Sequence, residues 1–283
     1  RVGVAGSIEL FFDSPTLDEF TDAYRGELGA DVVSAAAPTA DGESGPLSFM
    51  QEAMFYEAWT DPDTSSYLVD RVFELRGPLD VDALAGAVAA VDERHTGLRS
   101  RMTLVDGEPR ASVMAPGSLR LEVEDCVDGN GAVVADRIEA VRREGFELAA
   151  GPLVRFVLFR IGPQRHQLLV LLHHIVSDGW SMRLLTHELS ELYSAAVEGR
   201  DPNVPELEVQ YGDYVARQRE RDAAGAFDAG LEHFAARLAA PVPEVVIGTG
   251  DRPAGRSATA RHLFPLDPEL AAAFGRRATE LRT

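Results

Sequence analysis

The stretch QLLVLLHHIVSDGWS, residues Gln167–Ser181, decides the fold of this chain. Its apolar run from Gln167 to Leu172 predicts a buried strand, and Ser181 opens a helix whose apolar residues recur at helical spacing. Between them lie two histidines, an aspartate and a glycine. The pattern therefore predicts a strand, a tight loop and a helix start, an arrangement in which folds present catalytic side chains.

The two histidines are expected to have different roles. Successive strand residues point to opposite sides, so only one of His173 and His174 can face a given cleft, and the other is structural. A neutral imidazole, with a reference pKa of about 6.5, can accept a proton from an attacking amine or hydroxyl, or hold that nucleophile in line. A lone histidine in a buried strand is more often a satisfied core residue. Four polar or flexible residues at a buried strand end, however, are costly without a role.

No metal site is expected. Adjacent histidines on a strand diverge, and the sequence has neither an HExxH pattern nor a cysteine pair to supply further ligands. Gly179 leaves room for a substrate chain to pass close to the backbone. Arg94 and Arg99, just after a predicted helix, are by themselves more typical of residues that complement a helix dipole. Met50, Met54, Phe55 and Trp59 have the spacing of a packed helix face.

Working outward from the motif, apolar periods of 3.6 and 2 residues alternate along the chain, and this alternation predicts an α/β fold. The expected helices are Leu47–Trp59, Asp80–His95, Ala132–Glu144, Tyr211–Leu238 and one that follows an N-cap at Asp267; the expected strands are Tyr67–Gly77, Leu98–Leu104, Arg110–Val113, Leu153–Gly162 and Ala258–Asp267.

Composition limits the classes of partner. The 283 residues carry 46 acidic and 27 basic side chains, a formal net charge of −19, which repels nucleic acid and anionic lipid headgroups. A single cysteine, Cys126, excludes an internal disulfide and suits a reducing cytoplasm. No apolar run approaches the roughly 18 residues that span a membrane. We therefore expect a cytoplasmic protein that binds neither nucleic acid nor membrane.

The organisation along the chain suggests four segments. Residues 1–25 are too few to fold alone, and residues 26–45, rich in Ala, Ser, Gly, Asp and Pro, are expected to form a linker. A globular pattern runs over residues 46–240. Residues 241–283 begin with a Pro-rich crossing and continue as the start of a further, truncated unit. Both ends of the chain are expected to be cut rather than natural.

Taken together, the motifs resemble the condensation domains of nonribosomal peptide synthetases. The segment HHIVSDGWS agrees with the family's HHxxxDGxS signature at every specified position, and four further segments resemble family motifs in the family's order and spacing. Departures from those motifs are Thr96 for glutamate and Arg217 for tryptophan, and the L- or D-donor subtype stays open. The four segments are LSFMQEAMFYE (Leu47–Glu57), RHTGLRS (Arg94–Ser100), GFELAAGPLVR (Gly145–Arg155) and YGDYVARQ (Tyr211–Gln218).

This resemblance implies a chloramphenicol-acetyltransferase-like sandwich, with the N-terminal lobe in residues 46–240 and the start of the C-terminal lobe in residues 241–283. It implies that His174 is catalytic, that His173 is its structural neighbour, and that Asp178 pairs with Arg94 or Arg99. Gly179, Trp180 and Ser181 would border the substrate tunnel. The family joins a carrier-bound donor thioester to a carrier-bound acceptor amine, so peptide bond formation is the expected activity, and this truncated piece is not expected to catalyse well alone.

The partners and rival functions follow from the same resemblance. Residues Leu10–Ala23 resemble the last helices of a carrier protein, so residues 1–25 are expected to be a carrier remnant. Substrates would arrive on phosphopantetheine arms of upstream donor and downstream acceptor carriers, beside an adenylation domain, with no cofactor bound directly. An epimerization domain of the same superfamily, a non-catalytic docking domain that recruits tailoring enzymes, and a free-standing acyl-CoA transferase remain as alternatives.

Overall fold

The computed structural model describes residues 44–60, 67–126, 131–239 and 267–281. The carrier-like segment 1–25, the Pro-rich crossing, the expected strand Ala258–Asp267 and most of the linker lie outside the described residues. The chain divides into two compact units, residues 1–251 and residues 252–283.

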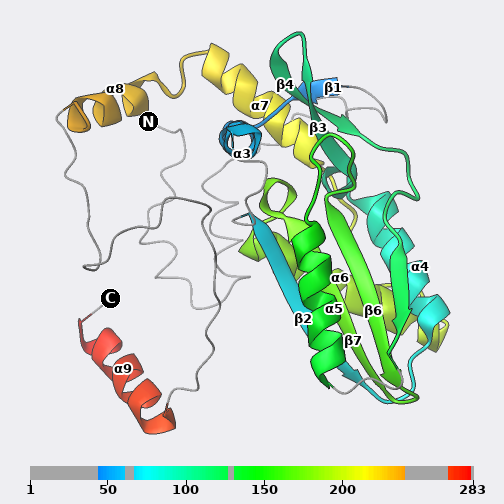
Figure 1. The fold of residues 1–283 in the computed structure, drawn as a ribbon. Coiled ribbons are helices and arrows are strands. Elements are labelled where there is room, and N and C mark those ends of the chain that lie inside the picture. The colour runs from blue at the N-terminus through cyan, green and yellow to red at the C-terminus, as the bar shows by residue number, and fades with distance from the viewer. Residues whose placement is uncertain (1–43, 61–66, 127–130, 240–266, 282–283) are drawn as a thin grey trace. The chain divides into compact units, whose positions relative to one another are not determined.

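A four-stranded mixed sheet forms the centre of the first unit (Figure 1). Its order is β2-β7-β6-β5, in which β7 runs antiparallel to both neighbours and β5 runs parallel to β6. Since β7 is an inner strand, its apolar residues are covered on both faces, which explains why its sequence is continuously apolar rather than alternating. The strands are β2 Leu68–Arg76, β5 Leu121–Asp125, β6 Val154–Gly162 and β7 Arg165–His173.

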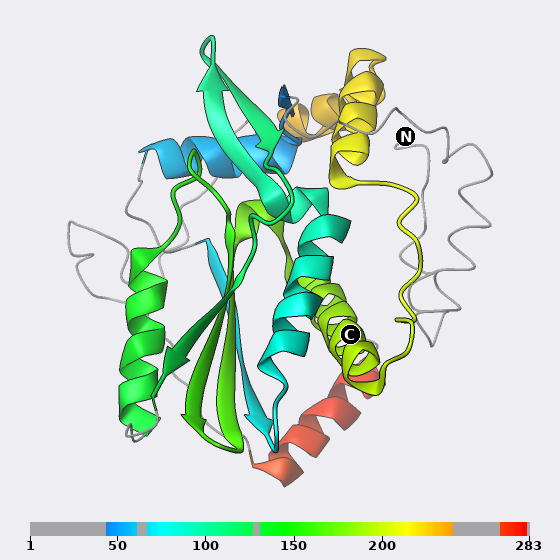
Figure 2. The same ribbon diagram turned by 90° about the vertical axis from the view of Figure 1, so that its right-hand side faces the viewer.

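Helices cover both faces of this sheet (Figure 2). On one face, Leu168, Val170 and Leu172 of β7 pack with α4 Val81–Arg94 and α6 Gly179–Glu198. On the other face, Leu169 and Leu171 pack against α5 Gly131–Glu144. Full burial of one such leucine contributes about 1.5–3 kcal/mol, so the strand that ends at the histidine pair is among the firmest parts of the fold.

A second, three-stranded antiparallel sheet lies beyond the end of β7 that carries the histidines (Figure 1). The β3–β4 hairpin turns at Asp106 and Gly107, whose φ values of 53° and 84° match the left-handed residues of a type I′ turn. The elements of this region are β1 Ser44–Pro46, η2 Thr96–Arg99, β3 Ser100–Val105, β4 Glu108–Val113, and the helices α3 Phe49–Thr60, α7 Tyr211–Ala223 and α8 Asp228–Arg237.

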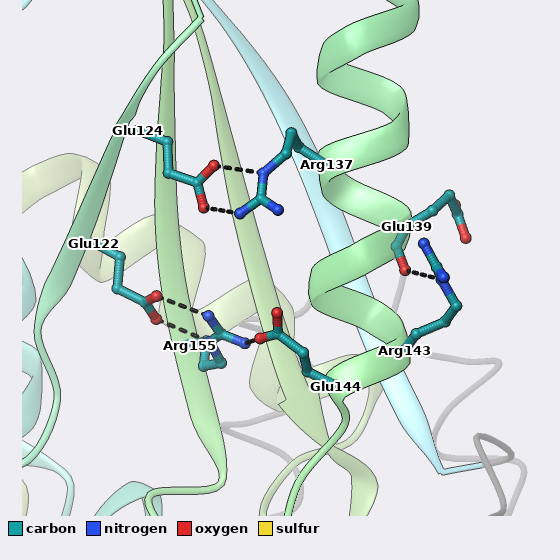
Figure 3. A network of polar contacts seen from close by, with 7 residues as sticks. All are labelled: Glu122, Glu124, Arg137, Glu139, Arg143, Glu144 and Arg155. Carbon is teal, nitrogen blue, oxygen red and sulfur yellow. Dashed lines mark hydrogen bonds and ion pairs between the residues drawn. The ribbon is translucent and has the colours of Figure 1, made fainter.

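An ionic network joins the edge strand β5 to its surroundings (Figure 3). Glu124 accepts two hydrogen bonds from Arg137 of α5, at 2.9 and 2.8 Å, and Glu122 accepts two from Arg155 of β6, at 2.9 and 2.7 Å. Arg155 also pairs with Glu144 at 2.5 Å, and its partners raise its pKa. Charges on an edge strand oppose pairing with another chain. The network is therefore a structural feature of this edge.

Most expected elements are present, but several differ. Residues 44 and 45, expected as linker, belong to strand β1, and Leu98 and Arg99, expected as strand, lie in the 3-10 helix η2. The single helix expected over Tyr211–Leu238 was wrong: two helices, α7 and α8, are separated near Gly225, where φ is 73°. The sequence analysis also missed β5, because its five residues LEVED contain only two apolar side chains. The helix after the motif begins at Gly179 rather than Ser181.

In the second unit, helix α9 spans Pro268–Leu281. The Asp267 carboxylate accepts hydrogen bonds from the Glu269 and Leu270 backbone amides, so the expected N-cap is confirmed. Across all described ranges, no helix is long and apolar enough to cross a membrane.

Candidate active site

The motif occupies the connection from β7 to α6. β7 ends at His173, a short 3-10 helix, η3, runs over His174–Val176, and α6 begins at Gly179. The His173 amide donates to Leu153 O at 2.9 Å, and the His174 amide donates to Tyr67 O at 2.7 Å. Both neighbouring strand ends therefore hold the histidine pair in place.

His173 is buried, and its Nδ1 is hydrogen-bonded within the turn. Its Nδ1 accepts a hydrogen bond from the Ile175 amide at 3.1 Å, and its ring lies 6.0 Å from that of Tyr67 and 6.4 Å from that of Phe146. Burial, and secondarily the neighbouring His174, lowers the pKa of His173 from 6.5 to about 4. His173 is thus a neutral residue at pH 7 that fixes the turn.

His174 differs in one respect that bears on chemistry. Its side chain is only partly buried, yet its Nδ1 is shielded from solvent and finds no hydrogen-bond partner among the described residues. A buried polar atom without a partner is uncommon in native proteins and calls for a functional explanation. Because Nδ1 itself is shielded, a reacting group would meet this partly exposed ring through its other nitrogen, Nε2.

Asp178 caps helix α6. Its Oδ1 accepts from the Ser181 amide at 2.7 Å and from the Ser181 hydroxyl at 2.6 Å, and these bonds, the hydroxyl's first, lower the pKa of Asp178. The resemblance implied that Asp178 pairs with Arg94 or Arg99. Within the described part of the chain Arg94 and Arg99 bond to other groups, so the pairing of either with Asp178 stays a prediction.

Arg94 pairs with a buried carboxylate on α6. Its Nε donates to Glu188 Oε2 at 3.1 Å, and the Nε2 of the adjacent His95 lies 2.5 Å from the same oxygen. Glu188 is only 2% exposed. A second donor of Arg94 bonds to Pro205 O. Arg94 therefore joins the end of α4 to α6 and to the loop after it.

Arg99 is also structural and is 2% exposed. It donates to Asp92 O at 2.8 Å and to Met114 O. The carboxylate of Asp92, fully buried, accepts from the Leu119 amide at 3.0 Å and from the Gly117 amide. Together these residues hold the segment after β4 against α4.

The structure brings two of the three expected tunnel residues to one pocket. Trp180 and Ser181 line a pocket of about 210 Å³. Gly179 does not line it, but a Cβ built on Gly179 would meet no atom within 4 Å, so the backbone there is open. Among the described residues no group of three or more His, Cys, Asp or Glu side chains could hold a metal ion.

Sequence reasoning missed Gln51, which reaches the motif from α3. The side chain, 5% exposed, donates from Nε2 to Ile175 O at 3.1 Å and accepts from the Ser48 amide at 3.1 Å. Helix α7 braces the same helix end, because the Tyr211 hydroxyl lies 2.9 Å from Ser48 Oγ and Gln218 Oε1 accepts from the Phe49 amide at 3.0 Å.

Glu188 was missed as well, although the sequence held a sign of it. It falls between Leu185 and Leu189 on the apolar stripe of α6, where a charged residue needs a buried partner. The expectation of a packed face on α3 holds for Phe55, which is 3% exposed. It fails for Met50 and Trp59, at 65% and 63%.

The family model named Condensation domain matches residues 43–282. The chain belongs to the condensation-domain family. Relatives include a probable non-canonical nonribosomal peptide synthetase, CymA, of Salinispora arenicola, 34% identical over 86% of this chain, and cyclosporin synthetase of Tolypocladium inflatum, 30% identical over 89%. The chain spans 3% and 2% of the length of these two relatives.

Solved structures agree on the fold. The starter condensation domain of rhizomide synthetase superposes with a TM-score of 0.65 over 71% of this chain and 49% of that one, at 18% identity. The X-domain solved in complex with OxyB from teicoplanin biosynthesis gives 0.66 over 78% and 48%, at 25% identity. The predicted α/β, chloramphenicol-acetyltransferase-like fold class and the family are confirmed. Condensation domains are acyltransferase-type enzymes that form amide bonds.

Proposed function

We propose that this condensation domain forms a peptide bond between two carrier-bound groups and that His174 is its catalytic residue. The observation that carries the proposal is the contrast within the histidine pair: His173 is engaged by the turn, whereas the His174 Nδ1 has no partner in the described structure. The acceptor's α-amine attacks the donor thioester carbonyl, a C–N bond forms, the C–S bond breaks, and the donor's thiol leaves with a proton.

The role of His174 follows from the acidity of the nucleophile. An α-amino group has a reference pKa of about 8, so a useful fraction is already neutral near pH 7. His174 then orients the amine and takes its proton as the tetrahedral intermediate collapses. Positioned acid–base help of this kind contributes about 100-fold to 10,000-fold in rate.

The partners belong to the same proposal. Donor and acceptor carriers present the substrates on phosphopantetheine arms, an adenylation domain selects the amino acid, and no cofactor is held by this chain. Residues 1–25 are the remnant of one carrier, 26–45 the linker, 46–240 the N-terminal lobe, and 241–283 the crossover and start of the second lobe. The family match over residues 43–282 and the relatives' identity as synthetases support the condensation-domain part of this proposal. We place the protein in the cytoplasm, which suits its single cysteine.

The test follows the mass of both carriers. In a synthetase that contains this chain, donor and acceptor carriers are loaded and monitored by intact-protein mass spectrometry, with native protein and with His174→Ala. Transfer of the donor mass to the acceptor, lost in the variant, is the expected result. Absence of transfer from folded, correctly loaded native protein would overturn the proposal.

A further inference from the structure

A pocket beside the motif has a largely apolar wall, and His95 is the one of its polar residues whose side chain is not used by a cap or a turn. It is lined by residues of α3, His95 and η2, β7, η3, α6, the segment before α7 and the start of α7. Its apolar wall includes Leu98, Leu172, Val176, Leu184, Leu185 and Val209. Leu172 and Val176 lie two residues before and two residues after His174. Trp180 and Leu184 are 56% and 43% exposed, so the pocket reaches the surface. A group bound here therefore lies next to the proposed catalytic loop.

The other polar side chains on the wall are committed to the protein. Gln51 bonds to Ser48 and Ile175, Gln210 accepts from the Thr96 amide at 3.2 Å, and the Tyr211 hydroxyl contacts Ser48. Ser181 donates its hydroxyl proton to Asp178. Each of these contacts serves a cap or a turn.

His95 is the exception. Its Nε2 lies 2.5 Å from Glu188 Oε2, and a carboxylate only accepts, so Nε2 carries a proton. Among the described residues the contact recorded for this ring is the one to Glu188 Oε2, and in the neutral ring the other nitrogen, Nδ1, is an acceptor. Arg94 already supplies a counter-ion to Glu188, so His95 is not needed to neutralise that charge. The side chain is 18% exposed and lines the pocket.

We propose that this pocket binds an aromatic side chain that ends in a hydrogen-bond donor, and that His95 Nδ1 accepts that hydrogen bond. The pocket volume of about 210 Å³ compares with the roughly 150 Å³ of an apolar cavity that holds benzene. One ring with one polar substituent fits, and a phenol is the simplest such group. The inference rests on the proposed function, because it makes the pocket the subsite for the side chain of one of the two substrates.

The experiment uses the whole chain and two probes that differ by one hydroxyl, 4-methylphenol and toluene. The side-chain nitrogens of ¹⁵N-histidine-labelled chain are followed by NMR during each titration. The expected result is a shift of His95 Nδ1 with 4-methylphenol and about fivefold tighter binding than toluene, the ratio given by one hydrogen bond of about 1 kcal/mol. Equal affinities, or a native chain that binds neither probe, would overturn the proposal.

Variants of the chain distinguish the contribution of the His95 hydrogen bond to probe binding from that of the space in the pocket. His95→Phe keeps a ring but removes the acceptor, so both probes should bind equally. His95→Gln keeps an amide donor for Glu188 and an acceptor oxygen, so part of the preference should remain. Leu184→Trp fills the pocket and should abolish binding of both probes. Leu104→Trp, the same change at an exposed position of β3 outside the pocket, should abolish neither. A preference that persists in His95→Phe contradicts the assignment.

Binding of the probes needs no condensation, so the two proposals fail separately. A pocket that fails the titration leaves peptide transfer by His174 intact, and a failed transfer assay leaves the pocket's ligand class intact. In the transfer assay, tyrosyl and phenylalanyl carriers compete at the donor and then at the acceptor position. His95→Phe should reduce a tyrosyl preference about fivefold at one of them, and no change at either position overturns the subsite's use.

Discussion

Two short segments, RHTGLRS (residues 94–100) and HHIVSDG (residues 173–179), lie at the ends of secondary-structure elements, and the structure treats the arginines of the first and His174 of the second oppositely. In the first segment, Arg94 and Arg99 are each tied to buried or backbone partners. In the second, His174 keeps a shielded nitrogen without a partner. Satisfied polar groups hold a fold together, and an unsatisfied one beside an open backbone marks the place where chemistry is expected.

The largest expected effect comes from breaking the scaffold at Glu188. Glu188→Ala leaves Arg94 and His95 without their buried carboxylate, so the free energy of unfolding should fall by about 3–5 kcal/mol. Urea denaturation measures the loss. Glu191→Ala, on the same helix, removes an exposed pair with Arg200 and should change stability far less. If both variants lost the same free energy of unfolding, the buried contacts of Glu188 would contribute no more to stability than the exposed pair of Glu191.

The second prediction concerns how the free energy of unfolding depends on pH through His173. His173 has a folded pKa of about 4 against 6.5 for the unfolded chain. Between pH 6.5 and pH 4 the unfolded state binds a proton at His173 and the folded state does not. The free energy of unfolding therefore falls as pH falls through this window. A difference of 2.5 pH units corresponds to about 3 kcal/mol at most. His173→Asn cannot titrate but keeps an acceptor for the Ile175 amide.

Unfolding free energies of native protein and His173→Asn, measured from pH 7 to pH 4, check this prediction. The native protein should lose more stability than the variant over that range. Parallel curves would mean that His173 is not held in its neutral form.

A smaller effect is expected at the start of α6. Asp178→Ala removes the N-cap and should cost about 1 kcal/mol, whereas Asp178→Asn keeps the capping oxygen and should cost little. Thermal or urea unfolding of the two variants gives the comparison. If the asparagine variant loses as much as the alanine variant, the charge of Asp178 matters more than its cap, and an ion pair becomes the better explanation.

The sequence could predict what depends on local pattern. The apolar run of β7, the cap at Asp267 and the stripe of α6 follow from neighbours in the chain, and each element is present. Strand β5 could not be found this way, because arginines from β6 and α5 support its acidic residues. The partners of Arg94 and Arg99 were beyond reach for the same reason. They depend on packing between segments that lie far apart in the chain: Arg94 is 94 residues from Glu188 and 111 residues from Pro205.

The measurement that tests the central claim most directly is a paired determination of transfer rate and unfolding free energy for His174→Ala, with native protein as reference. The unfolding free energy should stay within about 0.5 kcal/mol, as for substitutions that break no packing, cap or buried hydrogen bond. The single-turnover rate of donor transfer in the carrier-loaded synthetase should fall at least about 100-fold. A native transfer rate in the folded variant would contradict the assignment of His174, and a large loss of stability would place it with the scaffold residues instead.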